Sequence, residues 1–276
     1  MMNHHPSYIG VLLTFARNSL VREMSFRGNF VLHSIAATMW TAMNLLFYIL
    51  IFKYTDEIGK DTGWGKYPYF VFLATTMIIN SLMEAFIMPN AQEFSEQIRT
   101  GRLDFAMCKP IDTQFLISLH RVNWASLSNF AFGTCLMFWS LTRLNDSPAW
   151  AQVALYPLYV LCGVGILYSV MITLAASSVW MVRNQSLGDF FFYITTFSRY
   201  PMEIYRGSFG LPLQKFFTFV FPILIAINVP ARLMARPLSP AEWRLAVFTI
   251  FATAACLAVS RSVFKGSLKH YRSASS

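Results

Sequence analysis

The chain has 276 residues, of which 55% are hydrophobic and 13% are charged, and its formal net charge is +9. This composition is too apolar for a soluble domain of such length, so an ordinary soluble protein is excluded and a polytopic membrane protein is predicted. The positive charge does not indicate a nucleic-acid partner, because anionic lipid and topology explain basic residues at the ends of apolar runs.

Residues 6–27 predict a helix that lies in the membrane interface instead of spanning the bilayer. Apolar residues recur at helical spacing, while arginines interrupt the run. Amphipathic packing against a partner is the alternative. The apolar positions are Ile9, Leu12, Leu13, Ala16 and Leu20, and the arginines are Arg17, Arg22 and Arg27.

Residues 30–52 predict the first membrane span, because a helix of roughly 23 residues is about 34 Å long and crosses a hydrocarbon core. The hydrophilic stretch 53–66 then turns the chain. Its sequence G-K-D-T-G-W-G-K invites comparison with a phosphate-binding loop. However, Lys60 stands where that motif needs glycine, and Tyr67 replaces its Ser or Thr, so we expect no nucleotide site here.

Residues 69–88 predict the second span, which carries one acid, Glu84. An ionisable side chain within a span suggests a functional role, because burial of its charge is unfavourable. Glu84 also lies near enough to the end of the span to reach the interface. Both a functional and a structural interpretation therefore stay open.

Residues 90–112 form a polar island of mixed charge between two apolar runs. Glu93, Phe94, Glu96 and Ile98 suit a short helix, which Gly101 can end. Lys109-Pro110 stops the segment after that glycine. The island predicts a small helical knob on one aqueous side, to which a soluble partner could bind. A simple solvated connector is the alternative.

After the island, residues 115–121 predict a polar-faced helix and residues 122–141 the third span. The fourth span is predicted at 153–182. Gly163 and Gly165 give it a small face on which a neighbouring helix can pack closely.

The next two runs are irregular. Residues 187–209 begin as a plausible span but carry four residues untypical of one, Arg199, Pro201, Glu203 and Arg206, towards their far end. Residues 211–234 are apolar but contain Pro212, Pro222 and Pro230. Residues 245–263 predict an ordinary last span, followed by a basic tail.

The distribution of basic residues predicts the topology. They cluster in the N-terminal segment, the island, the turn at Arg183 and the tail, which should all be cytoplasmic. Both ends stay inside only if the proline-broken segment 211–234 enters and leaves on one side. We therefore expect a single all-α transmembrane domain over 1–276, with an interfacial helix, six transmembrane helices and an outer re-entrant hairpin before the last span.

This layout resembles the membrane subunit of type-2 ATP-binding-cassette exporters. The resemblance is carried by E-Q-I-R-T-G-R-L-D-F-A-M-C-K-P-I-D at 96–112, by F-S-R-Y-P-M-E-I-Y-R-G at 197–207 and by F-P-I-L-I-A-I-N-V-P-A at 221–231. It covers nearly the whole chain and is closest to an uncharacterised branch of these permeases.

The resemblance implies that the polar island is a coupling helix that docks on a separate ATPase, and that 211–234 is an extracytoplasmic re-entrant element. It implies export across a bacterial inner membrane, a second and different permease subunit, and ATP bound by the partner ATPase alone, so we expect no cofactor and no metal in this chain. The candidate docking residues are Glu93, Glu96, Arg99, Gly101, Arg102, Leu103, Asp104, Lys109 and Pro110. Candidate pathway or gate residues are Glu84, Arg199, Tyr200, Pro201, Glu203, Arg206 and Pro222.

Other classes fit the residues less well. An intramembrane enzyme would need a reactive constellation such as H-E-x-x-H or G-x-S-x-G, which the sequence lacks. A secondary transporter or a membrane scaffold that moves no substrate stays open as an alternative. The apolar, aromatic spans do not select a substrate.

Overall fold

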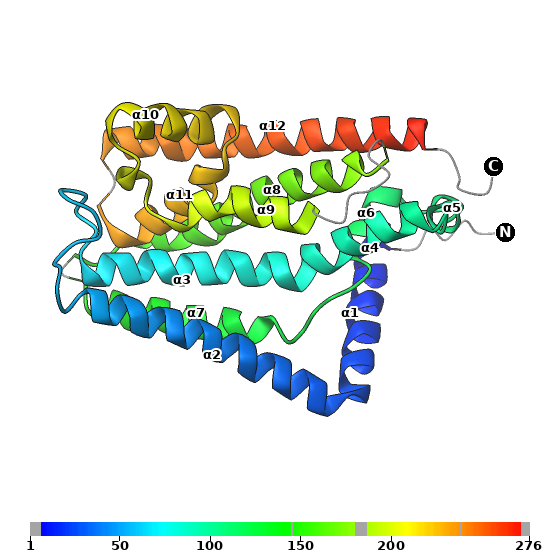
Figure 1. The fold of residues 1–276 in the computed structure, drawn as a ribbon, viewed down its shortest axis with the longest axis horizontal. Helices are drawn as coiled ribbons and strands as arrows, with labels where there is room; N and C mark the ends of the chain where they lie inside the picture. The colour runs from blue at the N-terminus through cyan, green and yellow to red at the C-terminus, as the bar shows by residue number, and fades with distance from the viewer. Residues whose placement is uncertain (1–6, 145, 180–186, 238, 272–276) are drawn as a thin grey trace.

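The computed structural model describes residues 7–144, 146–179, 187–237 and 239–271, and within these ranges the chain is helical with no strand. Long helices run side by side along the molecule, and α1 (Tyr8–Ser25) lies across them at one end (Figure 1). Four helical stretches among the described residues have the length and apolar composition to cross a membrane: Arg27–Ile51, Lys66–Ile98, Trp150–Ser177 and Glu242–His270. The expected multi-pass helical membrane architecture is thus confirmed.

Helix α1 presents different chemistry on different sides. Ser19 is buried against the rest of the protein. Ile9, Leu13, Leu20 and Met24, spaced by four, seven and four residues, are exposed and share one face. An apolar face left uncovered on a helix that lies across the bundle is suited to the membrane interface.

The second span continues into the polar island without a break. Helix α3 (Lys66–Leu82) passes through a π-helical turn, η1 (Met83–Ile87), into α4 (Met88–Arg99). The short helix expected around Glu93 is present as α4, and it is joined directly to the second span. Pro89 lacks the N–H that would bond the Ala85 carbonyl, and the Asn123 amide bonds that oxygen instead at 2.8 Å. The replacement partner lets the helix pass the proline.

The third span begins later than the sequence predicted. A short helix, α6 (Thr113–Leu119), is followed by an irregular segment, and α7 (Leu127–Leu141) starts only at Leu127. The expectation of helix from Val122 onward was wrong because the backbone of residues 121–124 is bonded to α1 and to the α3–α4 helix instead of to its own carbonyls. Helix α8 (Trp150–Ser177) follows; the turn at Arg183 lies outside the described residues.

The fifth apolar run is helical only in its first half. Helix α9 (Leu187–Thr196) gives way to two short 3₁₀ turns, Phe197–Arg199 and Met202–Ile204. Pro201 forces the extended backbone of Tyr200, and the Met202 amide is bonded by the Asn228 side chain at 2.7 Å. The run 187–209 is thus helical at its start and irregular towards its far end, where the sequence has Arg199, Pro201, Glu203 and Arg206.

A bent pair of helices precedes the last span. Helix α10 (Gly207–Lys215) continues through a π-helical turn (Phe216–Val220), and the chain then bends by 89° into α11 (Ile223–Ala235). Pro222 lies at the bend. Helix α12 (Pro240–His270) completes the bundle, with Ser239 and Glu242 forming a capping box at its start.

The core lies where α11 packs between α8 and α3. Nearly every residue of α11 is buried, including the polar Asn228. Gly163 of α8 faces the backbone of α11 so closely that a Cβ would collide with the Ala226 carbonyl oxygen. The small face expected on this helix therefore allows a close helix crossing.

Candidate functional site

The polar island forms a compact helical knob at one end of the bundle. We call residues 90–120 the knob: the end of α4, a turn at Gly101, α5 (Leu103–Met107) and α6. The beginning of α1 and the end of α12 lie at the same end (Figure 1). Gly101 has a φ of 70°, so it ends α4 in the left-handed conformation that glycine adopts without strain.

Buried aromatic and aliphatic side chains fasten the knob to the bundle. Leu103 is fully buried, and Phe94 packs against Phe264 of α12 with ring centroids 5.6 Å apart. On α1, Tyr8 packs edge-on against Phe115 of α6, with centroids at 4.9 Å. The knob is thus an integral part of the helix bundle and not a loose connector.

Asn90 joins the knob to the irregular segment after α6. Its Nδ2 donates to the Arg121 carbonyl at 2.7 Å, and its Oδ1 accepts from the Arg121 amide at 2.7 Å. Glu93, one turn further, pairs with the Arg121 side chain at 2.6 Å. Residue 121 is therefore held by both its backbone and its side chain.

The same segment is bonded to α1. The Val122 amide donates to Ser19 Oγ at 3.1 Å, and the Trp124 amide donates to Glu23 Oε1 at 3.1 Å. The Trp124 indole N–H donates to the Ala16 carbonyl at 3.1 Å. These bonds connect the interfacial helix to the knob through one short stretch of backbone.

Helix α6 is tied to two further helices by a polar network. Asp112 caps α6 through the Phe115 amide and pairs with Arg261 of α12. Arg261 also donates to Gln114 at 2.7 Å, and Gln114 donates to the Tyr168 hydroxyl of α8 at 2.9 Å. The hydrogen bonds from Arg261 hold the pKa of Asp112 below its ordinary value, so the carboxylate is charged at neutral pH.

The outer surface of the knob combines charge with an exposed aromatic ring. Phe105 is 76% exposed, and Arg102, Lys109 and Pro110 are exposed beside it. Glu96 and Asp104 are partly buried, and the side chain of Arg99 lies outside what the structure describes. Of the predicted docking residues, Glu93 and Leu103 point inward to structural partners, so they fasten the knob instead of forming its outer surface.

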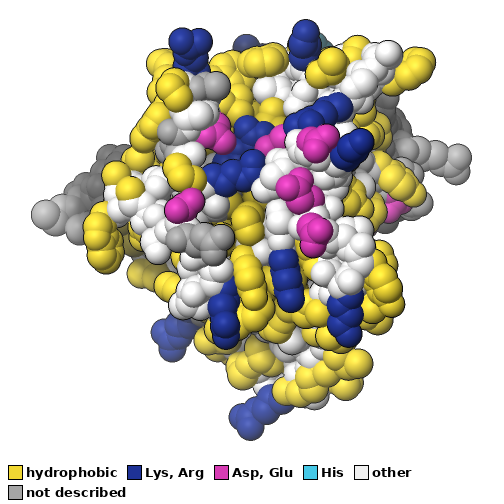
Figure 2. Space-filling view, turned by 90° about the vertical axis from the view of Figure 1, so that its left-hand side faces the viewer, with side chains coloured by type: hydrophobic (Ala, Val, Ile, Leu, Met, Phe, Trp, Pro, Cys, Tyr) yellow, Lys and Arg dark blue, Asp and Glu magenta, His cyan; other side chains and the backbone are white. Residues whose placement is uncertain are grey.

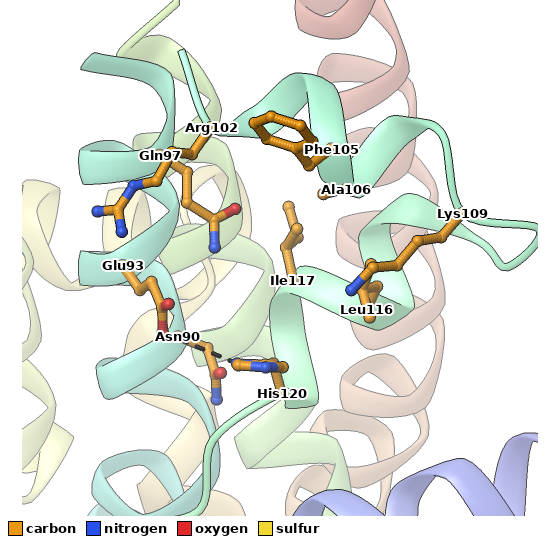
Figure 3. Close-up of a pocket in the computed structure, with 10 residues that line it drawn as sticks. All are labelled: Asn90, Glu93, Gln97, Arg102, Phe105, Ala106, Lys109, Leu116, Ile117 and His120. Carbon is orange, nitrogen blue, oxygen red and sulfur yellow. Dashed lines mark ion pairs between the residues drawn. The ribbon is translucent and has the colours of Figure 1, made fainter. Parts of the chain in front are cut away.

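A pocket of about 220 Å³ opens between α4, α5 and α6 (Figure 3). Its apolar wall is formed by Phe105, Ala106, Leu116 and Ile117. Its polar lining comes from Asn90, Glu93, Gln97, Arg102, Lys109 and His120. Burial lowers the pKa of His120, and the nearby cations Arg121, Lys109 and Arg22 act in the same direction against the opposing effect of Glu93, so the imidazole is neutral at pH 7.

At the opposite end of the bundle, Glu203 forms the centre of a second charged cluster. It pairs with Arg232 at 2.8 Å and lies 3.8 Å from Arg236, whose guanidinium stacks over Trp64 at 4.3 Å. Arg206 donates to the Asp61 carbonyl at 3.1 Å. Figure 2 shows acidic and basic side chains gathered near the centre of this end. The cluster holds the loop before α3 against the segments that flank α10 and α11.

Three of the remaining candidate pathway residues interact with one another. Arg199 stacks on Phe192 at 4.5 Å and interacts electrostatically with both Glu84 and Tyr200. Glu84 lies on the π-helical turn η1 and is exposed. Pro201 and Pro222 are buried.

Several residues of these clusters escaped sequence reasoning. The role of Asn90 had no local signal, because its partner Arg121 lies 31 positions away in the sequence. Phe105 is the only aromatic residue between Gly101 and Pro110. An aromatic ring within a short polar turn is a signal for a contact with a partner. The roles of His120, Arg232 and Arg236 had no local signal, since their partners lie far away in the sequence.

Comparison with known proteins gives one family. The model of a family described as "ABC-2 family transporter protein" matches residues 38–275. The searches of curated proteins and of solved structures give no match.

Proposed function

The chain belongs to the ABC-2 transporter family, and from this premise we propose that it is a permease subunit whose knob docks on a separate ATPase subunit. As a member of that family it is a membrane transport component and not itself an enzyme. ATP is bound by the partner alone. Closure of the ATPase pushes the knob, and the connected helices change access between the two faces of the membrane.

The observation that carries this proposal is the way the knob is built into the bundle. Helix α4 is the direct continuation of α3, so a displacement of the knob moves a membrane-spanning helix without a hinge loop. The Asp112–Arg261 pair and the Gln114–Tyr168 bond transmit the same displacement to α12 and α8. A solvated connector would need none of these bonds.

The docking surface comprises the exposed part of the knob. Phe105 supplies an aromatic anchor of the kind that dominates protein interfaces. The charged residues Glu96, Arg102, Asp104 and Lys109 supply electrostatic complementarity, with Gly101 and Pro110 shaping the turn. We include Arg99 in this proposal from the sequence alone, because its side chain lies outside the described part of the chain.

We further propose six crossings with both ends in the cytoplasm of a cell with a bacterial inner membrane, and a re-entrant element formed by α10 and α11. The 89° bend at Pro222 supports re-entry. The location of the knob, the start of α1 and the end of α12 at one end supports the shared side of the termini. Export and a second, different permease subunit rest on the resemblance to type-2 exporters.

In this arrangement the cluster around Glu203 and Arg206 would close the outer end of the path. The cluster and the knob lie at opposite ends of the bundle, as two gates that open alternately to the two faces of a membrane would. Glu84, Arg199, Tyr200 and Pro201 would then line the segments that move.

The test is co-purification of the chain from its native membrane in mild detergent, followed by identification of bound subunits and an ATPase assay. We expect an ATPase subunit with the wild type and about ten-fold less of it with Phe105→Asp, because an interface anchor is replaced by a charge. Tyr54→Asp, at an exposed aromatic residue before α3, is the matched control. Full retention of the ATPase by Phe105→Asp would contradict docking at the knob.

A further inference from the structure

The pocket of the knob lies beside the proposed anchor Phe105 and faces the same aqueous side. It is bounded by three helices, α4, α5 and α6, that belong to one fastened unit (Figure 3). Its volume of about 220 Å³ exceeds that of a single water molecule several-fold, since a water occupies roughly 30 Å³ in the liquid. The space suits one side chain.

Three buried polar atoms of the lining residues have no hydrogen-bond partner among the described residues. Glu93 Oε2 is ion-paired with Arg121, which leaves the Gln97 Oε1 and the His120 Nδ1. Figure 3 shows the Gln97 oxygen turned into the space between α4 and α5, and His120 turned towards Glu93. The His120 Nδ1 lies 3.9 Å from Glu93 Oε2, too far for a hydrogen bond. A carboxamide oxygen accepts hydrogen bonds, and a neutral imidazole offers an acceptor nitrogen.

The charges around the pocket select against a charged occupant. Arg102 and Lys109 line it, and Arg121 already neutralises Glu93, so an incoming ammonium or guanidinium group would meet an excess of positive charge. A carboxylate would suit the cations but would leave both acceptors without a donor. The occupant that fits the pocket is therefore an uncharged hydrogen-bond donor.

The opposite wall adds a second requirement. Ala106, Leu116 and Ile117 present apolar surface, which favours an occupant with an apolar body. A side chain with an aromatic body and a single donor at its tip meets both conditions, as tyrosine does.

We propose that this pocket receives a tyrosine side chain of the ATPase subunit, whose single hydroxyl hydrogen is donated to the Gln97 Oε1. The interface is then reciprocal, because the knob inserts Phe105 into the ATPase and accepts an aromatic side chain in return. This inference rests on the proposed docking function and specifies the partner chemistry that the function leaves open.

The test measures the affinity of the detergent-purified permease for the ATPase subunit. Ala106→Trp fills the pocket and should raise the Kd about ten-fold or more. A ten-fold rise in Kd equals about 1.4 kcal/mol, which is the order expected for loss of one well-packed interface contact. Ala149→Trp is the matched control, because Ala149 is exposed before α8, outside the knob, and does not line the pocket. Gln97→Met removes an acceptor at nearly constant volume, and thermal unfolding verifies that each variant is folded.

The donor is identified by replacing the exposed tyrosines of the ATPase one at a time with phenylalanine. We expect one such variant to weaken binding, and its effect to be non-additive with Gln97→Met in a double-mutant cycle. Wild-type affinity for Ala106→Trp and Gln97→Met, or additivity for every tyrosine, would overturn the inference and leave water as the occupant while docking still stands. Absence of any ATPase from the wild-type preparation would overturn the docking function itself.

Discussion

Asn90 holds the peptide groups on both sides of Arg121, accepting from its amide and donating to its carbonyl, each at 2.7 Å. The two residues are 31 positions apart, yet this pair decides where the irregular segment after α6 lies. The same side chain donates to the Phe86 carbonyl at 2.6 Å, one turn before Asn90 in the same helix.

Replacement of Asn90 should therefore destabilise the knob. Asn90→Ala leaves the Arg121 amide and two carbonyl oxygens without this partner, and each buried polar group left unpaired costs about 1–3 kcal/mol. We expect a clearly lower unfolding temperature in detergent. Asn29→Ala, at an exposed position near the start of α2, is the control; equal unfolding temperatures for the two variants would refute the role given to Asn90.

Gly163 should not tolerate even a methyl group. In Gly163→Ala the new Cβ collides with the Ala226 backbone oxygen, so α8 and α11 must separate and the core loses packing. Overpacking of this kind typically costs about 1–3 kcal/mol. Gly266→Ala in α12 meets nothing within 4 Å and should stabilise its helix by roughly 0.5–1 kcal/mol. Thermal unfolding of the two variants should shift in opposite directions; shifts of the same sign contradict this account.

The pair of Asp112 with Arg261 should add a pH-dependent part to stability. The pKa of Asp112 in the folded chain lies below its ordinary value of 3.8 because Arg261 bonds the carboxylate. For a depressed pKa, the stabilisation is complete above the ordinary value and is lost as the pH falls through the folded-state pKa. Unfolding temperatures of the wild type should therefore fall below pH 3.8 more steeply than those of Asp112→Asn.

Asp146→Asn, on an exposed loop after α7, serves as the comparison for that titration. Because this variant leaves the Asp112–Arg261 pair in place, its unfolding temperature should fall at acid pH as steeply as that of the wild type. If the unfolding temperatures of the wild type and Asp112→Asn fall equally steeply at acid pH, the pair does not contribute in this way.

The Glu203–Arg232 pair at the other end should behave as a buried unit, because its two side chains are only 15% and 13% exposed. Removal of one partner leaves a buried charge and costs about 3–5 kcal/mol in such pairs. The double variant Glu203→Met with Arg232→Met should be less destabilised than the sum of the two single variants. Strict additivity in thermal unfolding would mean that the two side chains do not act together.

The sequence by itself determined the class of protein and the approximate helix positions. Hydropathy identified the membrane-spanning runs, the mixed-charge island identified the knob, and Gly101 identified the end of α4, because these features depend on composition and on local backbone conformation. The resemblance in residues 96–112 led to the family that the comparison then confirmed.

Only the tertiary structure decided how the interrupted segments behave. Helix α3 runs on through Pro89 because Asn123 bonds the freed Ala85 carbonyl, and the segment before α7 stays irregular because Asn90, Ser19 and Glu23 bond its backbone. The irregular segment after α9 is held where Asn228 bonds the Met202 amide. In each case a partner distant in sequence satisfies a backbone group, and local patterns do not reveal such a partner.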